Sequence, residues 1–288
     1  MPDTTGKRQK RIFGQAVFSF FLLILMAGPA AGYVLDGRHI LALMLEQMNL
    51  PTRMRIEQTL TVFDERLETD RMEVNQTAAY KLPENFRSEI KTENLHRIYV
   101  TAGGEALTVV DDKIVSQASK PGHHYKDLFC YLDRKALADH LAYLGINVGK
   151  SSYGRWKEKI AYVIGAQYPD ESKPQLWIDK ESFLPIRWLF QVDHPDVGLD
   201  RVEFRYKDWQ QTAGSWYPGE IEIFHGQGLS RRIKVHALEI DPLFDDALFN
   251  IDHLRAVYEE PQPGATQPET QNDIDQQIKE FRDIFESE

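Results

Sequence analysis

The chain contains very little cysteine and none of the short motifs that commonly mark a catalytic site. Its one cysteine, Cys130, cannot form an internal disulfide bond, so the hydrophobic core must stabilise the domain alone. Roughly 250 residues are enough for such a core. No glycine-rich phosphate loop, Gly-x-Ser-x-Gly elbow or His-Glu-x-x-His sequence occurs in the chain. These absences argue against the common classes of enzyme, and we expect no catalytic residues.

The chain also has no excess of positive charge, because its 34 basic residues are outnumbered by 44 acidic ones and the formal net charge is -10. Phosphate backbones are bound by basic surfaces, so nucleic acid is not an expected partner. The closest histidine pair, His123-His124, lies in a segment read as a strand, where adjacent side chains point to opposite faces. No cysteine or histidine follows at ligand spacing. We therefore expect no metal site and no cofactor.

The first 32 residues resemble a secretory signal. Four basic residues precede an almost uncharged stretch, Ile12–Ala31, which ends among small residues: Gly28, Ala30, Ala31 and Gly32. Cleavage after Gly32 or Ala30 would release the rest of the chain and lower its formal charge to about -13. The alternative is an uncleaved membrane anchor, because the stretch comes close to the roughly 20 residues that span a bilayer. Either outcome predicts an exported, periplasmic protein, soluble or anchored in the inner membrane.

The C-terminal 28 residues differ in composition from the body. Residues 261–272 hold Pro261, Pro263, Gly264 and Pro268 among polar residues, which is typical of a flexible linker. Residues 273–288 carry apolar side chains at helical spacing, which predicts an amphipathic tail helix. The folded domain is therefore expected to span residues 33–260.

Alternating apolar and polar residues dominate this domain, and the period of two is typical of strands with one buried face. It is unbroken in Val202–Lys207 and recurs about a dozen times between Ile56 and Ile240. Short turns such as Gly103-Gly104 and Asp179–Ser182 make neighbouring strands antiparallel. Within the domain only two helices are predicted, Gly37–Met48 and Asp133–Gly145. The fold class is therefore α+β, dominated by one large antiparallel sheet.

A dozen strands exceed what a flat sheet carries comfortably, so this sheet should curve into an incomplete barrel. The two short helices would then cover the concave face, through Ile40 and Met44 on the first and Leu137 and Leu141 on the second. Apolar side chains left uncovered would line a cavity for a hydrophobic ligand. The candidate lining residues are Phe86, Ile98, Val100, Trp177, Ile186, Trp188, Phe190, Phe204, Tyr206, Ile221 and Ile223.

Several segments resemble the outer-membrane lipoprotein-sorting superfamily, which is LolA/LolB-like. The order of a strand, a "Leu-Trp-Ile-Asp" strand, a turn and a strand opening with Leu-Pro matches Ile160–Ala166, Gln175–Asp179 and Phe183–Arg187. A closing pattern of two strands and a turn matches Tyr217–Ile221, Ile233–Ile240 and Pro242–Phe249. An early turn matches Leu82–Arg87, although Leu82 stands where the superfamily's dedicated lipoprotein carrier has an arginine that ties its lid to the sheet. Arg87 is the candidate to replace that arginine. The similarity covers roughly residues 40–255.

This resemblance implies a half-barrel with helices as a lid and a hydrophobic cavity for acyl chains. It implies a carrier or binder of lipid or lipoprotein acyl chains in the periplasm, with an inner-membrane exporter or an outer-membrane acceptor as further partners. One alternative is an envelope sensor of the RseB type, which would use the same fold and dock a protein partner through the tail helix. Another is an exported enzyme acting on an envelope polymer, which would need convergent carboxylates or a nucleophile in a cleft.

Overall fold

The structure is a computed structural model that describes residues 34–65, 67, 69–194 and 198–258. The predicted signal, the linker and the tail helix lie outside these residues. Thirteen antiparallel strands form one sheet. They are β1 (Arg53–Phe63), β2 (Arg71–Lys81), β3 (Asn85–Lys91), β4 (His96–Ala102), β5 (Glu105–Val110), β6 (Lys113–Ser116), β7 (Ser151–Trp156), β8 (Lys159–Ile164), β9 (Gln175–Asp179), β10 (Pro185–His194), β11 (Gly198–Thr212), β12 (Ser215–His225) and β13 (Gly228–Ile240).

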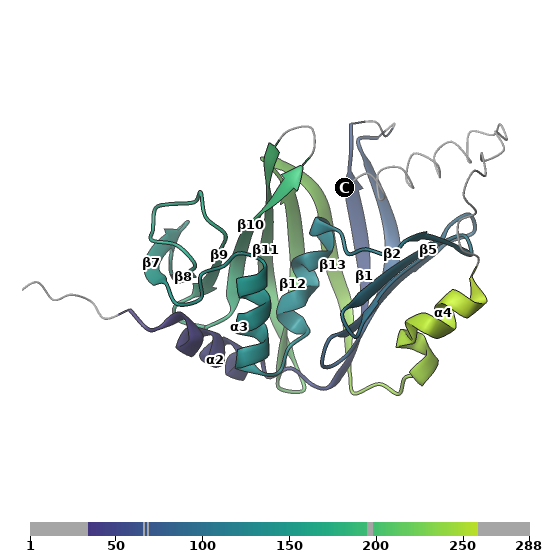
Figure 1. Ribbon diagram of the computed structural model, residues 1–288, viewed down its shortest axis with the longest axis horizontal. Coiled ribbons are helices and arrows are strands. Elements are labelled where there is room, and N and C mark those ends of the chain that lie inside the picture. Colours follow the sequence, from purple (N-terminus) through teal and green to yellow (C-terminus); the bar gives the residue numbers. More distant parts are fainter. Residues whose placement is uncertain (1–33, 66, 68, 195–197, 259–288) are drawn as a thin grey trace, which may run out of the picture. The chain divides into compact units, whose positions relative to one another are not determined.

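The strand order explains how the chain builds the sheet. It runs β6-β5-β4-β3-β2-β1-β13-β12-β11-β10-β9-β8-β7, so every pair of neighbours is consecutive in sequence except β1 and β13. Tight turns join most of these consecutive strands, and left-handed backbone at Gly103, Gly104 and Asp111 permits two of them. The sheet curves without closing, because β6 and β7 form its two edges (Figure 1). The predicted α+β half-barrel is confirmed, with thirteen strands in place of about a dozen.

The predicted helices are present as α2 (Gly37–Met48) and α3 (Arg134–Tyr143). Asp36 and Asp133 cap their N-termini by accepting hydrogen bonds from the backbone N–H groups of Arg38 and Ala136. Ile40, Met44, Leu137 and Leu141, the predicted lid residues, are all fully buried.

Four elements were not predicted. They are strand β7, the 3-10 helices η1 (Pro121–Phe129) and η2 (Asp246–Phe249), and helix α4 (Ile251–Val257). The segment containing His123 and His124 is thus helical, and the argument that these neighbours lie on opposite faces of a strand is wrong. The segment from Gln117 to Lys150, which contains η1 and α3, connects the two edges of the sheet.

Helices lie on both faces of the sheet. We call the face that contacts η1 the inner face and the opposite one the outer face. Side chains of η1 contact Tyr99, Phe190 and Tyr206 on the inner face. On the outer face, Ile251 and Leu254 of α4 pack against buried side chains of β4 and β5. The strands near β4 are therefore buried on both faces.

Candidate functional site

The inner face carries a continuous apolar surface on β10, β11 and β12. Register pairs Trp188 with Phe204, Phe204 with Ile223, and Tyr206 with Ile221, and cross-strand pairs point to the same side of a sheet. The ring of Phe190 packs at a tilt against Trp188 and Phe204, with ring centroids 5.7 and 5.4 Å apart. Seven predicted lining residues share this face: Phe86, Trp188, Phe190, Phe204, Tyr206, Ile221 and Ile223.

The other four predicted lining residues lie on the outer face. Ile98 and Val100 alternate with Tyr99, whose ring meets His123 of η1, and they pack instead beneath α4. Trp177 pairs with Arg187 and packs with Leu189 in an outer cluster. These four residues cannot line one cavity together with the inner seven.

Ile186 joins that outer cluster because of a register shift. The shift lies between Pro185 and Arg187 and interrupts the alternation that carries Trp188 to the inner face. The predicted grouping of Ile186 with Trp188 is therefore wrong for this reason.

Helix η1 covers the inner face, and from here on we call it the lid. A hydrogen bond, aromatic packing and a cation–π contact hold it against the sheet. The Tyr206 hydroxyl donates to the backbone carbonyl of Tyr125 at 3.0 Å. The ring of Phe129 packs edge-on against Tyr206, with centroids 5.8 Å apart. The ammonium of Lys126 lies 5.3 Å from the centroid of the Phe86 ring, within reach of a cation–π interaction. Side chains of the lid thus cover the apolar surface of the inner face.

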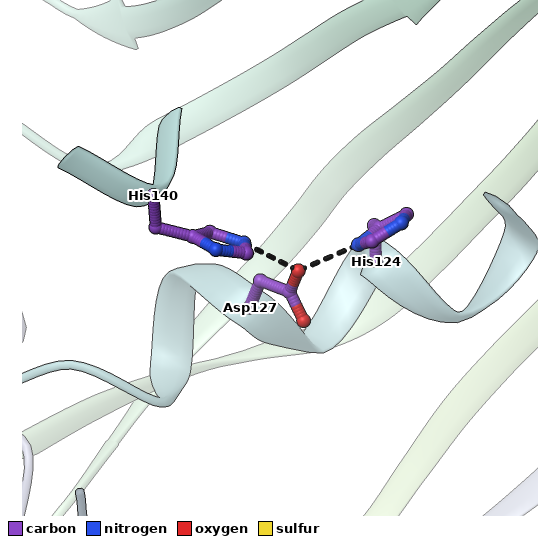
Figure 2. Close-up of side chains that lie close together, drawn as sticks. All are labelled: His124, Asp127 and His140. Carbon is purple, nitrogen blue, oxygen red and sulfur yellow. Dashed lines mark hydrogen bonds and ion pairs between the residues drawn. The ribbon is translucent and has the colours of Figure 1, made fainter. Parts of the chain in front are cut away.

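A buried carboxylate connects η1 to α3 (Figure 2). His124 Nδ1 and His140 Nε2 each lie 2.7 Å from Oδ2 of Asp127, and Lys126 Nζ donates to Oδ1 at 2.7 Å. Burial opposes the charge on Asp127, but Lys126 and the two histidines outweigh it and hold the pKa of the carboxyl well below its usual range. Burial likewise opposes the charge on Lys126, and Asp127 outweighs it, which raises the pKa of the ammonium. The pair is therefore ionised.

The part of the inner face near β3, β4 and β13 is polar. A cavity of about 20 Å³ is lined by Leu60, Gln76, Ser88, Arg97, Tyr99, His123, Tyr125, Ile223, Arg231 and Ile233. Burial first, and then the charges of Arg97 and Arg231, lower the pKa of His123 well below its usual value, so its imidazole is neutral.

The buried polar atoms of the inner face that have no hydrogen-bond partner among the described residues include Nδ1 of His123, in the polar part, and Nε1 of Trp188, in the apolar part. Both atoms can form a hydrogen bond with a polar group that reaches the inner face.

A surface pocket of about 470 Å³ lies between α2 and the start of α3. Its lining residues are Ala42, Leu45, Glu46, Asn49, Leu50, Tyr131, Leu132, Asp133 and Arg134. It lies at the contact between the two predicted lid helices, and sequence reasoning gave no sign of it.

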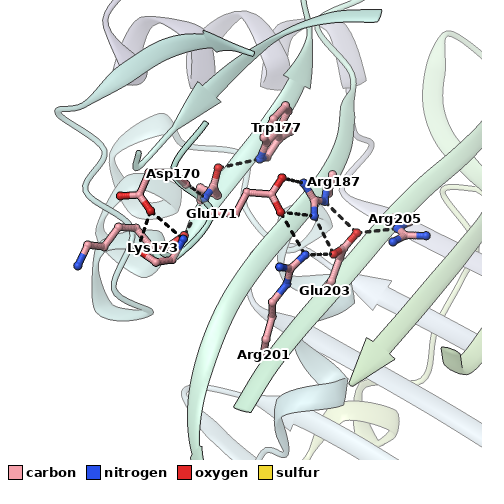
Figure 3. Close-up of polar contacts among 10 residues, drawn as sticks. Asp170, Glu171, Lys173, Trp177, Arg187, Arg201, Glu203 and Arg205 are labelled. Atoms are coloured by element: carbon pink, nitrogen blue, oxygen red, sulfur yellow. Dashed lines mark hydrogen bonds and ion pairs between the residues drawn. The ribbon is translucent and has the colours of Figure 1, made fainter. Parts of the chain in front are cut away.

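A buried ion-pair network lies on the outer face and has a structural role (Figure 3). Arg187 Nε and Nη2 donate to Glu203 at 2.8 and 2.9 Å, while Nη1 and Nη2 donate to Glu171 at 2.6 and 2.9 Å. Burial opposes ionisation of Glu203, but hydrogen bonds from Arg187 and Arg201 outweigh it and lower the pKa of Glu203 to about 2. Because Glu171 belongs to the connection between β8 and β9, the network fastens that connection to the sheet.

The missing arginine at Leu82 is not replaced by Arg87. Arg87 Nη1 donates to the carbonyl of Leu248 in η2, and its Nη2 donates to Glu89 at 2.7 Å. Both partners lie away from η1 and α3. The carboxylate of Asp127 ties η1 to α3 and makes no hydrogen bond to a strand among the described residues.

No protein-family model matches the chain, and no curated protein matches its sequence. Among solved structures, a LolA superfamily protein from Nitrosomonas europaea aligns with a TM-score of 0.52 at 13% identity, over 76% of this chain and 100% of that one. The chain has the fold of the LolA superfamily. An outer membrane lipoprotein-sorting protein domain from Vibrio parahaemolyticus agrees, with a TM-score of 0.50 at 11% identity over 76% of this chain and 97% of that one.

This LolA-like fold confirms the resemblance read from the sequence. The complex of MucA with MucB from Pseudomonas aeruginosa aligns with a TM-score of only 0.19 at 8% identity, over 73% of this chain and 100% of that one, so it adds no support for the sensor alternative. No helix among the described residues is long and apolar enough to cross a membrane.

Proposed function

We propose that this chain is a periplasmic, non-enzymatic carrier of lipid or lipoprotein acyl chains, which binds them on the inner face after η1 moves away. The observation that carries the proposal is that a nine-residue 3-10 helix covers the apolar inner face of β11 and β12. Runs of 3-10 helix longer than three or four residues are uncommon, because their hydrogen bonds have poor geometry. Such a lid is easier to displace than an α-helix of equal length.

The energetics set a minimum length for the ligand. Displacing η1 exposes the apolar side chains of Tyr125, Leu128 and Phe129, which are buried in the closed state. At about 1.5–3 kcal/mol each, their exposure costs roughly 5–9 kcal/mol. Each buried methylene of a ligand gains about 0.8 kcal/mol, so about six to eleven methylenes offset this loss. We therefore expect long acyl chains to bind and short ones to fail.

The polarity of the inner face suits an amphiphile better than a plain hydrocarbon. The aromatic and aliphatic residues of β10–β12 would contact the chain, while the part around His123 would receive polar groups of the ligand. Nδ1 of His123 and Nε1 of Trp188 would gain partners in the bound state. Export and any exporter or acceptor partner belong to this proposal, since transfer would require a donor and a better acceptor site.

A photo-crosslinking experiment tests the proposal. The purified protein would be incubated with a diazirine-bearing long-chain fatty acid, irradiated and mapped by peptide mass spectrometry. We expect label on the inner residues Phe190, Phe204 and Ile223, removed by excess unlabelled long-chain lipid but not by a four-carbon acid. Outer residues Ile98 and Val100 serve as internal controls, because they are equally apolar and equally buried. Absence of competable label, or label concentrated on the outer residues, would refute the carrier function.

A further inference from the structure

The cluster of Asp127 with His124 and His140 has the donor set of a metal centre. One donor atom of each residue lies within 4.8 Å of the other two, and the cluster combines two imidazoles with one carboxylate. Imidazole nitrogen favours zinc and its neighbours in the first transition row, whereas magnesium and calcium favour oxygen donors. Two adjacent elements supply the ligands, with His124 and Asp127 from η1 and His140 from α3.

An ion would enter the cluster after movement of the two histidine side chains. Each histidine nitrogen lies 2.7 Å from Asp127 Oδ2, and the three donor atoms lie within 4.8 Å of one another. Ligands bound tetrahedrally at about 2.0–2.1 Å lie roughly 3.3 Å from one another, so each nitrogen would move about 0.6 Å away from Oδ2 and the two nitrogens would approach each other by up to about 1.5 Å. In the closed cluster His124 can carry its proton on Nδ1, and transfer of that proton to Nε2 frees the Nδ1 lone pair for the metal.

Lys126 orients the carboxylate of Asp127, and the two histidines remain partly exposed to solvent. Lys126 donates to Asp127 Oδ1, which orients the carboxylate so that Oδ2 faces the two imidazoles. The side chains of His124 and His140 are 18% and 20% exposed, so an ion can reach the donors from solvent and keep a water ligand. The ammonium of Lys126 opposes a second positive charge nearby, so the affinity should be lower than that of a structural zinc site.

We propose that His124, Asp127 and His140 form a binding site for one divalent transition-metal ion such as Zn²⁺. Bound there, the ion joins η1 to α3 through three coordinate bonds in place of two hydrogen bonds. It would thus stabilise the closed lid. The site does not depend on the carrier proposal, because its three donor atoms face one another, although the ring of His124 also packs edge-on against Phe190 of the inner face.

Zinc titration tests the site directly. The full-length protein would be treated with EDTA, dialysed and titrated with Zn²⁺ by calorimetry, in parallel with His124→Gln, His140→Gln and the double variant. We expect one ion per chain in the wild type, affinity at least tenfold weaker in each single variant, and loss of binding in the double variant. His253→Gln is the matched control, since His253 is exposed on α4 at the outer face.

Two readouts separate a built site from surface binding. Zn²⁺ should raise the Tm of the wild type and leave that of the double variant unchanged, because only the folded wild type binds the ion. Co²⁺ should give a visible absorption band in the wild type that the double variant lacks. Each variant's urea unfolding curve would establish that it is folded. No saturable binding, equal binding by the double variant, or equal weakening by His253→Gln would overturn the proposal.

Discussion

Replacing His140 with phenylalanine should open the lid without removing the packing around it. The change deletes the hydrogen bond between His140 Nε2 and Asp127 Oδ2 and keeps a ring beside Tyr131, whose centroid lies 5.1 Å away. Hydrogen bonds to charged groups contribute about 1.5–3 kcal/mol, and the partial exposure of His140 places this one at the lower end. A loss of about 1.4 kcal/mol changes an equilibrium tenfold.

This loss should appear as tighter ligand binding. If a long-chain probe binds only the open lid, its apparent Kd is the intrinsic Kd divided by the open fraction. A tenfold larger open fraction therefore lowers the apparent Kd about tenfold. The assay is titration of a fluorescent long-chain fatty acid into the EDTA-treated wild type and the His140→Phe variant.

The control variant is Lys135→Ala on the same helix. Lys135 pairs with Asp139 on the exposed side of α3 and touches neither η1 nor the sheet in any contact that the structure describes. We expect Lys135→Ala to leave the Kd unchanged. A folded His140→Phe variant that binds the probe as weakly as the wild type, or more weakly, would refute the idea that η1 is a gate held by Asp127.

Three further predictions concern stability. Glu203, with a pKa of about 2 against an ordinary 4.5, contributes about 3 kcal/mol above pH 4.5 that is lost as pH falls toward 2; urea unfolding of Glu203→Gln should therefore depend less on pH in this range. Gly154→Ala places a methyl group 2.7 Å from two buried side chains and should lower stability by about 1–3 kcal/mol, whereas Gly149→Ala meets one atom at 3.4 Å and should change little. Phe204→Ala should lower stability by about 3–5 kcal/mol, and Tyr143→Ala, at an 86% exposed position, by under 0.5 kcal/mol in the same thermal scan.

The strands were predictable where one face is buried and the other is not. Val202–Lys207 alternates cleanly and forms the middle of β11. Strand β7 is not predicted from the sequence, because Ser151–Trp156 has glycine at its fourth position, where a strand pattern would have a side chain. The structure gives the reason, since Trp177 and Val163 occupy the space of the missing side chain.

Which face a residue occupies was harder to predict than which strand it belongs to. In Ile98-Tyr99-Val100 every side chain is apolar, because α4 covers the outer face and η1 the inner one. Period-two alternation therefore vanishes where both faces are buried. Ile186 was misplaced for a different reason, because a local register shift leaves no mark in the apolar pattern.

The Asp127 cluster could not be predicted from spacing. His124 and Asp127 are three residues apart, which brings side chains together only on a helix, and the segment was read as a strand. His140 belongs to α3 and is brought close only by tertiary packing. Nothing in the sequence between Asp127 and His140 indicates that their side chains meet.

The connection from Gln117 to Lys150 begins at one edge strand of the sheet, β6, and ends at the other, β7. Helix η1 therefore belongs to a segment that is covalently attached at both ends to opposite edge strands of the half-barrel. A segment held at both ends does not swing about a single hinge. A change in the distance between β6 and β7 also changes the span that this segment must cover, so the curvature of the sheet and the position of the lid are linked through the chain itself.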